Sequence, residues 1–136
     1  MQNKEFTLFR AFFIVAALWN LLGAIFGYFN TAFTFQHFFG RELNDPLLYA
    51  IYKGAWGTTL VYFIGYLIVA FNPVRHPGIV IVGGIGKVGY AIKLLELYST
   101  GIASPVVLIV VIGDFLFSLF FVYYFIRMYQ AKEKIL

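Results

Sequence analysis

The feature that most constrains this chain is a succession of four long apolar segments separated by short polar breaks. A helix needs about 20 apolar residues to cross the roughly 30 Å hydrocarbon core of a bilayer. Hydrophobic residues make up 62% of the chain and charged residues 12%, against about 45–50% and about 25% in soluble domains. The sequence therefore predicts an all-α integral membrane protein. The expected spans are residues 6–29, 47–71, 78–98 and 105–127.

Turn-forming residues mark the breaks between these segments. The links after the second and third segments are short, which forces consecutive helices to run in opposite directions. We therefore expect an antiparallel four-helix transmembrane bundle, formed by residues 1–136 as a single domain. The break motifs are Asn44-Asp45-Pro46, Asn72-Pro73, His76-Pro77-Gly78, Ser99-Thr100-Gly101 and Ser104-Pro105.

The distribution of Lys and Arg predicts the orientation, because cytoplasmic loops carry an excess of these residues. Four crossings place both termini on the more basic side, so we expect a multi-pass protein of the cell (inner) membrane with cytoplasmic termini. The first segment is longer than the apolar part of a signal peptide and is read as a retained helix. The cytoplasmic set is Lys4, Arg10, Arg75, Arg127, Lys132 and Lys134, against Arg41 and Lys53 on the other side.

Composition excludes several classes of function. The chain has no cysteine, which excludes disulfides, thiol redox motifs, cysteine-ligated zinc and iron–sulfur clusters. Its net charge of +4 reflects basic residues at the ends of apolar segments, so no nucleic-acid partner is expected. His37 and His76 are expected on opposite sides of the membrane, where they cannot jointly hold a metal or haem. We expect no metal and no cofactor.

A glycine-rich motif in the third segment matches a nucleotide-binding pattern. The stretch from Gly84 to Gly89 reads G-x-G-x-x-G and follows the strand-like residues 79–82. A dinucleotide site also requires a βαβ unit and an acidic residue about 20 positions on, and the rest of the chain offers no parallel sheet. Close helix packing explains the glycines better, as it does for Gly23 and Gly27 on the face of Asn20.

Asp114 is the most informative polar residue. The stretch from Ser104 to Arg127 contains no other charge before its last residue. An ionised group near the bilayer centre costs about 2.5–3.5 kcal/mol or more and usually faces a partner or a cavity. The preceding segment carries Lys87 and Lys93, and at about 1.5 Å per residue either lysine can reach the depth of Asp114.

Helical spacing sorts these charges onto different faces. Lys87 shares a face with Tyr90, whereas Lys93 and Glu96 lie together on the roughly opposite face. One set is expected to face the bundle interior and the other a cavity, a partner subunit or the interface. Asn20 and Trp56 lie at compatible depths, and Lys53 lies higher, where it can extend toward water. The binding or ion-pair candidates are Asp114, Lys87, Lys93, Asn20, Trp56, Tyr90, Glu96 and Lys53.

Two features leave alternatives open. The Lys–Asp pair either locks two helices in register or lines a polar cavity that binds a solute or passes a proton. The connection from Asn30 to Asp45, rich in phenylalanine, is either an aromatic belt at the interface or a lid over the outer mouth of the bundle.

Short motifs along the chain resemble those of the DoxX-like superfamily of small four-helix bacterial membrane proteins. The resemblance covers nearly the whole chain and implies the same four-span layout. Members of that superfamily are regarded as quinone-linked or redox-partner subunits, but this sequence contains no recognisable redox centre. The motifs are Tyr52-Lys53-Gly54-Ala55-Trp56-Gly57, Gly65-Tyr66, Asn72-Pro73-Val74-Arg75-His76, Gly86-Lys87 and Gly113-Asp114.

The sequence favours a small membrane protein that binds or moves a small polar solute or a proton, with Asp114 as acceptor or proton carrier. A second hypothesis is a subunit or assembly partner of a larger membrane complex. A third is a membrane enzyme acting on a lipid or quinone, although no arrangement of residues typical of catalysis supports it. Four short helices are few for a solitary transporter, so we expect a homo-oligomer or a complex subunit.

Overall fold

The four long apolar segments form four long helices. The computed structural model describes residues 3–133, which contain five helices and no strand. Four of the helices are long and apolar enough to span a membrane. Lys134, one of the basic residues used for the orientation, lies outside the described residues. The helices are α1 Asn3–Gly27, α2 Thr31–Phe39, α3 Pro46–Phe71, α4 Pro77–Ser99 and α5 Val107–Gln130.

The turn residues recognised in the sequence set the start of α3. The Asp45 carboxylate accepts hydrogen bonds from the backbone N–H groups of Leu47 and Leu48, at 2.8 and 3.0 Å. Pro46 occupies the first helical position, where its missing N–H has no cost. This N-cap satisfies donors that a helix start otherwise leaves unpaired.

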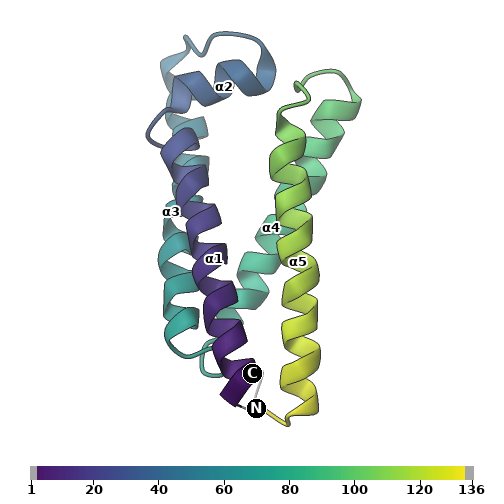
Figure 1. The fold of residues 1–136 in the computed structure, drawn as a ribbon. Coiled ribbons are helices and arrows are strands. Elements are labelled where there is room, and N and C mark those ends of the chain that lie inside the picture. Colours follow the sequence, from purple (N-terminus) through teal and green to yellow (C-terminus); the bar gives the residue numbers. More distant parts are fainter. Residues whose placement is uncertain (1–2, 134–136) are drawn as a thin grey trace.

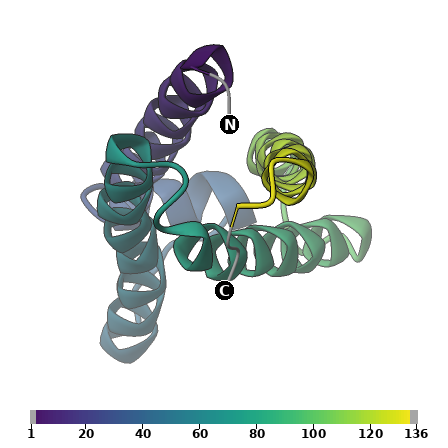
Figure 2. The same cartoon turned by 90° about the horizontal axis from the view of Figure 1, so that it is seen from below.

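The long helices associate as two pairs, α1 with α3 and α4 with α5 (Figure 1). Seen along the helices, the first pair lies on one side of the molecule and the second pair on the other (Figure 2). Both chain termini lie at the same end of the molecule, and α2 lies at the opposite end (Figure 1).

An aromatic core joins the two pairs at the end that carries the termini. Phe12 of α1 stacks on Phe120 of α5, with ring centroids 3.5 Å apart. The Tyr124 hydroxyl donates a hydrogen bond to the Pro73 carbonyl in the α3–α4 turn. Side chains from all four long helices fill this core. Its buried members are Phe9, Phe13, Ala16, Ala17, Tyr66, Val69, Ala70, Val80, Phe121, Tyr124 and Met128.

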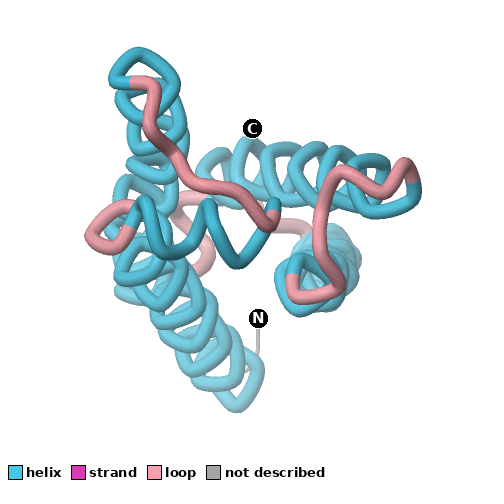
Figure 3. Tube along the Cα trace, turned by 90° about the horizontal axis from the view of Figure 1, so that it is seen from above, coloured by secondary structure: helices cyan, strands magenta, loops and turns pink. Residues whose placement is uncertain are grey.

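The first connection contains a helix that the sequence analysis did not anticipate. α2 lies across the end of the molecule opposite the termini (Figure 3). It ends at Phe39 and is followed by the C-cap Gly40, whose φ of 66° favours glycine. The Ser104 backbone N–H, in the loop before α5, donates to the Phe38 carbonyl at 2.7 Å. The Ser104 hydroxyl also donates to the His37 carbonyl. α2 therefore bridges the two helix pairs at the end where the aromatic core does not reach.

Candidate functional site

A cavity of about 640 Å³ lies between the two helix pairs. All five helices contribute to its wall, with Phe33 and Phe38 of α2 on the side away from the termini. Tyr66, a member of the aromatic core, lines the opposite side. Most of the wall is aromatic or aliphatic, and the charged lining residues are Lys87 and Asp114, both within the described chain.

Lys87 and Asp114 form a buried ion pair in this cavity. The Lys87 ammonium lies 3.0 Å from Asp114 Oδ1, and the two residues are only 8% and 5% exposed. The rings of Tyr66 and Phe117 flank the ammonium at 5.8 and 5.3 Å from their centroids, within the range of a cation–π contact. The pair joins α4 to α5, and the aromatic rings shield it from solvent.

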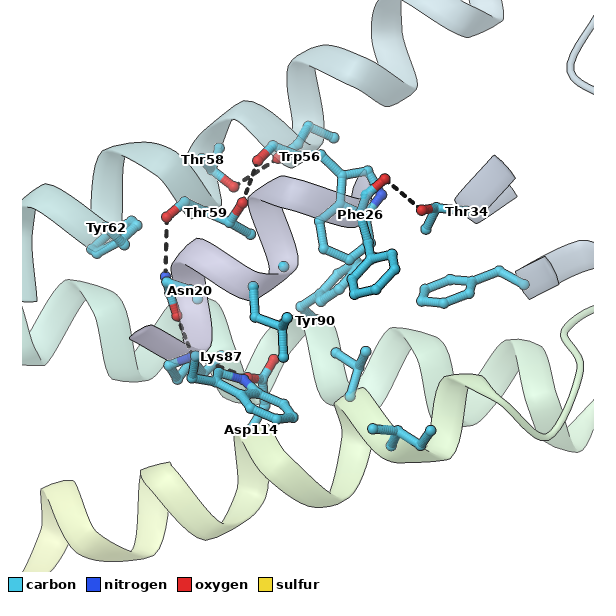
Figure 4. Close-up of a pocket in the computed structure, with 18 of the residues that line it drawn as sticks. Asn20, Phe26, Thr34, Trp56, Thr58, Thr59, Tyr62, Lys87, Tyr90 and Asp114 are labelled. Carbon is cyan, nitrogen blue, oxygen red and sulfur yellow. Dashed lines mark hydrogen bonds and ion pairs between the residues drawn. The ribbon is translucent and has the colours of Figure 1, made fainter. Parts of the chain in front are cut away.

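Hydrogen bonds extend the ion pair to the other two long helices. Lys87 donates to Asn20 Oδ1 on α1 at 2.9 Å, and the Asn20 amide donates to the Thr59 carbonyl on α3 at 3.4 Å. Trp19 of α1 donates its indole N–H to Asp114 Oδ1 at 3.1 Å. Figure 4 shows Asn20, Lys87 and Asp114 converging from three helices. We call these five residues, Trp19, Asn20, Thr59, Lys87 and Asp114, the polar network.

Two glycines make room for the tryptophans of the site. A Cβ atom on Gly113 would lie 2.2 Å from the Trp19 ring, and one on Gly27 would lie 1.8 Å from the Trp56 ring. Real Cβ atoms do not approach other atoms this closely, so both positions require glycine in this arrangement. Because Gly113 precedes Asp114, it lets the Trp19 indole rest against α5 and reach the carboxylate.

The polar network has unfilled hydrogen-bonding positions. Asp114 Oδ1 accepts both the Trp19 and the Lys87 bonds, while Oδ2 accepts none from residues 3–133. An ammonium has three donors, and Lys87 uses two of them, toward Asn20 and Asp114. The Tyr66 hydroxyl is buried without a hydrogen-bond partner in the described chain. Buried polar groups are normally satisfied, so these positions indicate space for a bound molecule or water.

The remaining candidates from the sequence fall into two groups. Trp56 and Tyr90 line the cavity together with the network. Lys93 instead pairs with Glu96 at 2.6 Å on the surface, where their side chains are 62% and 58% exposed. Lys53 does not line the cavity and lies 4.9 Å from the centre of the Tyr28 ring. Lys87, and not Lys93, is therefore the cation beside Asp114.

Three residues of the site were missed from the sequence. Trp19, Thr59 and Tyr66 contact the network or line the cavity, but an aromatic or hydroxyl residue in an apolar helix is not distinctive on its own. Gly113 could have indicated a partner such as Trp19. A glycine beside a buried acid leaves room for a large side chain that donates a hydrogen bond to the carboxylate. Thr59 acts through its backbone carbonyl, which no side-chain pattern reveals.

The cavity has an apolar rim between α1 and α5. Four exposed residues line the cavity here: Leu22 and Phe26 of α1, Ile109 of α5, and Val106 just before α5. On the α3–α4 side, the exposed lining residues are Ala55, Thr58, Gly86 and Tyr90. Exposed lining residues thus lie on both sides of the cavity, and those on the α1–α5 side form a rim of large apolar side chains.

No family model, curated protein or solved structure matches this chain. The resemblance to the DoxX-like superfamily stays a prediction. Two of the short motifs on which it rests, Gly86-Lys87 and Gly113-Asp114, supply the ion pair of the cavity.

Proposed function

We propose that this chain is a four-span membrane protein that binds a small molecule at the polar network of its cavity. The supporting observation is the Lys87–Asp114 pair, which is buried at a cavity wall with hydrogen-bonding positions still open. A pair that served only to lock helices would gain stability from being fully satisfied. An ionisable group at mid-span is a functional hypothesis by default, and here it borders enough space for a ligand.

We further propose that the spans are antiparallel and that both termini are cytoplasmic. The helix lengths and apolar composition support the spans, and the excess of Lys and Arg among the residues near the termini supports the orientation. The polar network then lies at mid-depth, the aromatic core lies in the cytoplasmic half, and α2 lies at the outer surface. Because side chains of all four long helices pack together in the aromatic core, its position in the cytoplasmic half favours binding over passage of a solute.

The orientation predicts which engineered cysteines are labelled from outside the cell. Because the chain has no native cysteine, single Gln36→Cys, Thr100→Cys and Arg75→Cys variants can be compared directly, and all three positions are exposed. A membrane-impermeant maleimide added to intact cells should label Gln36→Cys and Thr100→Cys. Arg75→Cys should react only after permeabilisation. The opposite pattern would reverse the orientation, and labelling of all three in intact cells would contradict four spans.

The binding proposal predicts a small molecule that copurifies with the protein. Membranes are extracted directly into polymer nanodiscs, and the bound small molecules are quantified by mass spectrometry after denaturation. The wild type should hold about one equivalent of a compound that the Lys87→Met/Asp114→Leu variant has lost, because that variant keeps the apolar bulk and removes the polar network.

The matched control is the Lys93→Met/Glu96→Leu variant, which removes an equally charged but exposed pair. It should hold the compound as the wild type does. Equal small-molecule contents in all three samples, or none in the wild type, would contradict binding. The alternative of a subunit in a larger membrane complex would then be favoured.

A further inference from the structure

The charge balance of the cavity limits the ligand to a neutral group. Lys87 and Asp114 carry opposite charges and lie 3.0 Å apart. Among the described residues that line the cavity, no other Lys, Arg, Asp or Glu is present to balance a further charge, and the lining His37 is an exposed residue of α2. An ion that entered this apolar space would have to lose its hydration without a counter-ion, which is costly. A neutral ligand avoids that cost.

The unfilled positions of the network require both a donor and an acceptor. The free Oδ2 of Asp114 accepts hydrogen bonds only, and the third N–H of Lys87 donates only. A hydroxyl or an amide fills both positions at once. A ketone, ester or quinone carbonyl accepts only, so it would leave Oδ2 without a partner. The buried Tyr66 hydroxyl, which also lacks a partner, can join such a group as donor or acceptor.

The rest of the cavity fits an apolar body that arrives from the membrane. Phe26 and Trp56 line the space between the network and α2 (Figure 4). Leu22, Val106 and Ile109 continue this apolar surface to the α1–α5 rim. In a bilayer this rim faces hydrocarbon at the level of the spans, where water-soluble molecules are scarce and lipid-soluble ones are concentrated.

From these observations we infer that the ligand is a neutral amphiphile whose hydroxyl or amide head binds Lys87 and Asp114. Its apolar body occupies the aromatic part of the cavity, and it enters from the membrane between α1 and α5. The inference rests on the proposed function and specifies the class of ligand. The polar head of the bound ligand would then lie at mid-depth in the bilayer, whereas the head groups of free lipids lie at the bilayer surface.

Intrinsic fluorescence tests the ligand class, because Trp19 and Trp56 are the chain's two tryptophans and both line the cavity. The full chain in liposomes is titrated with three lipid probes that carry the same mid-chain nitroxide quencher: stearyl alcohol, methyl stearate and octadecane. Stearyl alcohol should quench saturably, with an apparent affinity at least about tenfold above that of octadecane, since hydrogen bonds to charged groups discriminate by this much. Methyl stearate, whose ester group only accepts hydrogen bonds, should quench with an apparent affinity between those of the other two probes.

Two variants test the route of entry and the head-group site. Ile109→Phe narrows the rim, whereas Ile112→Phe adds the same bulk at an exposed position of α5 that does not line the cavity. Only Ile109→Phe should slow the onset of quenching by stearyl alcohol. The Lys87→Met/Asp114→Leu variant should remove the preference for the alcohol over octadecane, and Lys93→Met/Glu96→Leu should keep it.

The other outcomes separate the inference from the proposed function. Equal affinities for methyl stearate and stearyl alcohol would overturn the need for a donor. Equal onset rates in Ile109→Phe and Ile112→Phe would overturn entry between α1 and α5. If no lipid probe saturates and water-soluble acrylamide quenches both tryptophans, the ligand is a polar solute, which overturns the inference and leaves the proposed function standing. If neither kind of quencher reaches the tryptophans, both fail.

Discussion

Replacing Asp114 by leucine is expected to lower the free energy of unfolding by about 3–5 kcal/mol. Lys87 is only 8% exposed. Without Asp114, its ammonium group would lose its counter-ion and one of its hydrogen bonds. The Trp19 indole N–H, which donates to the same oxygen, would also lose its acceptor. The measurement is reversible unfolding in mixed micelles, with the fraction of denaturing detergent as the variable.

The double variant Lys87→Met/Asp114→Leu should recover most of that loss. It removes both charges together, and replacing a buried ion pair by apolar residues of similar volume is often neutral or stabilising. The Lys93→Met/Glu96→Leu variant should change stability by less than about 1 kcal/mol, because exposed pairs contribute little. If Asp114→Leu and the double variant lose the same stability, the two residues do not interact as a buried pair.

The four long helices could be predicted from the sequence because their cause is local. Apolar length alone sets a span, and capping residues such as Asp45 with Pro46 mark a start without reference to the rest of the chain. The depth of Asp114 followed from the same arithmetic of 1.5 Å per residue. Helical periodicity separated Lys87 from Lys93 by face, but it did not say which face was buried.

The choice between the two lysines depends on tertiary packing, which the sequence does not encode locally. Lys87 is buried because its face of α4 meets Asn20 on α1 as well as α5. That meeting requires the two helix pairs to close on each other at the aromatic core. Which helices pair with one another depends on how the side chains of all four long helices pack together. The periodicity of apolar residues along each helix does not predict this packing.

α2 was not anticipated for a related reason. A nine-residue helix is too short to be stable by its own propensity, so its formation depends on what it rests against. Here the Thr34 hydroxyl donates a hydrogen bond to the Phe26 carbonyl on α1. Near the other end of α2, the Ser104 backbone N–H donates to the Phe38 carbonyl. These contacts join residues far apart in the chain. Phe33 and Phe38 of this segment line the cavity, and the alternatives of a lid and an aromatic belt both stay predictions.

Replacing Gly113 by alanine should destabilise the protein by about 1–3 kcal/mol, the usual cost of inserting bulk into a packed contact. The new methyl group would stand 2.2 Å from the Trp19 ring, so the indole must move away from α5 and lose its hydrogen bond to Asp114. The tryptophan emission should shift as well, because one of the two indoles changes its surroundings. Unfolding in mixed micelles and the emission spectrum of the folded protein are the two measurements.

The matched control is Gly89→Ala on α4, where an added Cβ meets nothing within 4 Å. Alanine exceeds glycine in helix propensity by about 0.8–1.0 kcal/mol in water, so Gly89→Ala should be neutral or slightly stabilising and should leave the emission unchanged. The difference between the two variants removes this propensity effect and reports the packing of Trp19 alone. If Gly113→Ala matches Gly89→Ala in both measurements, the indole does not rest on α5. The carboxylate of Asp114 would then hold one more open position for a ligand.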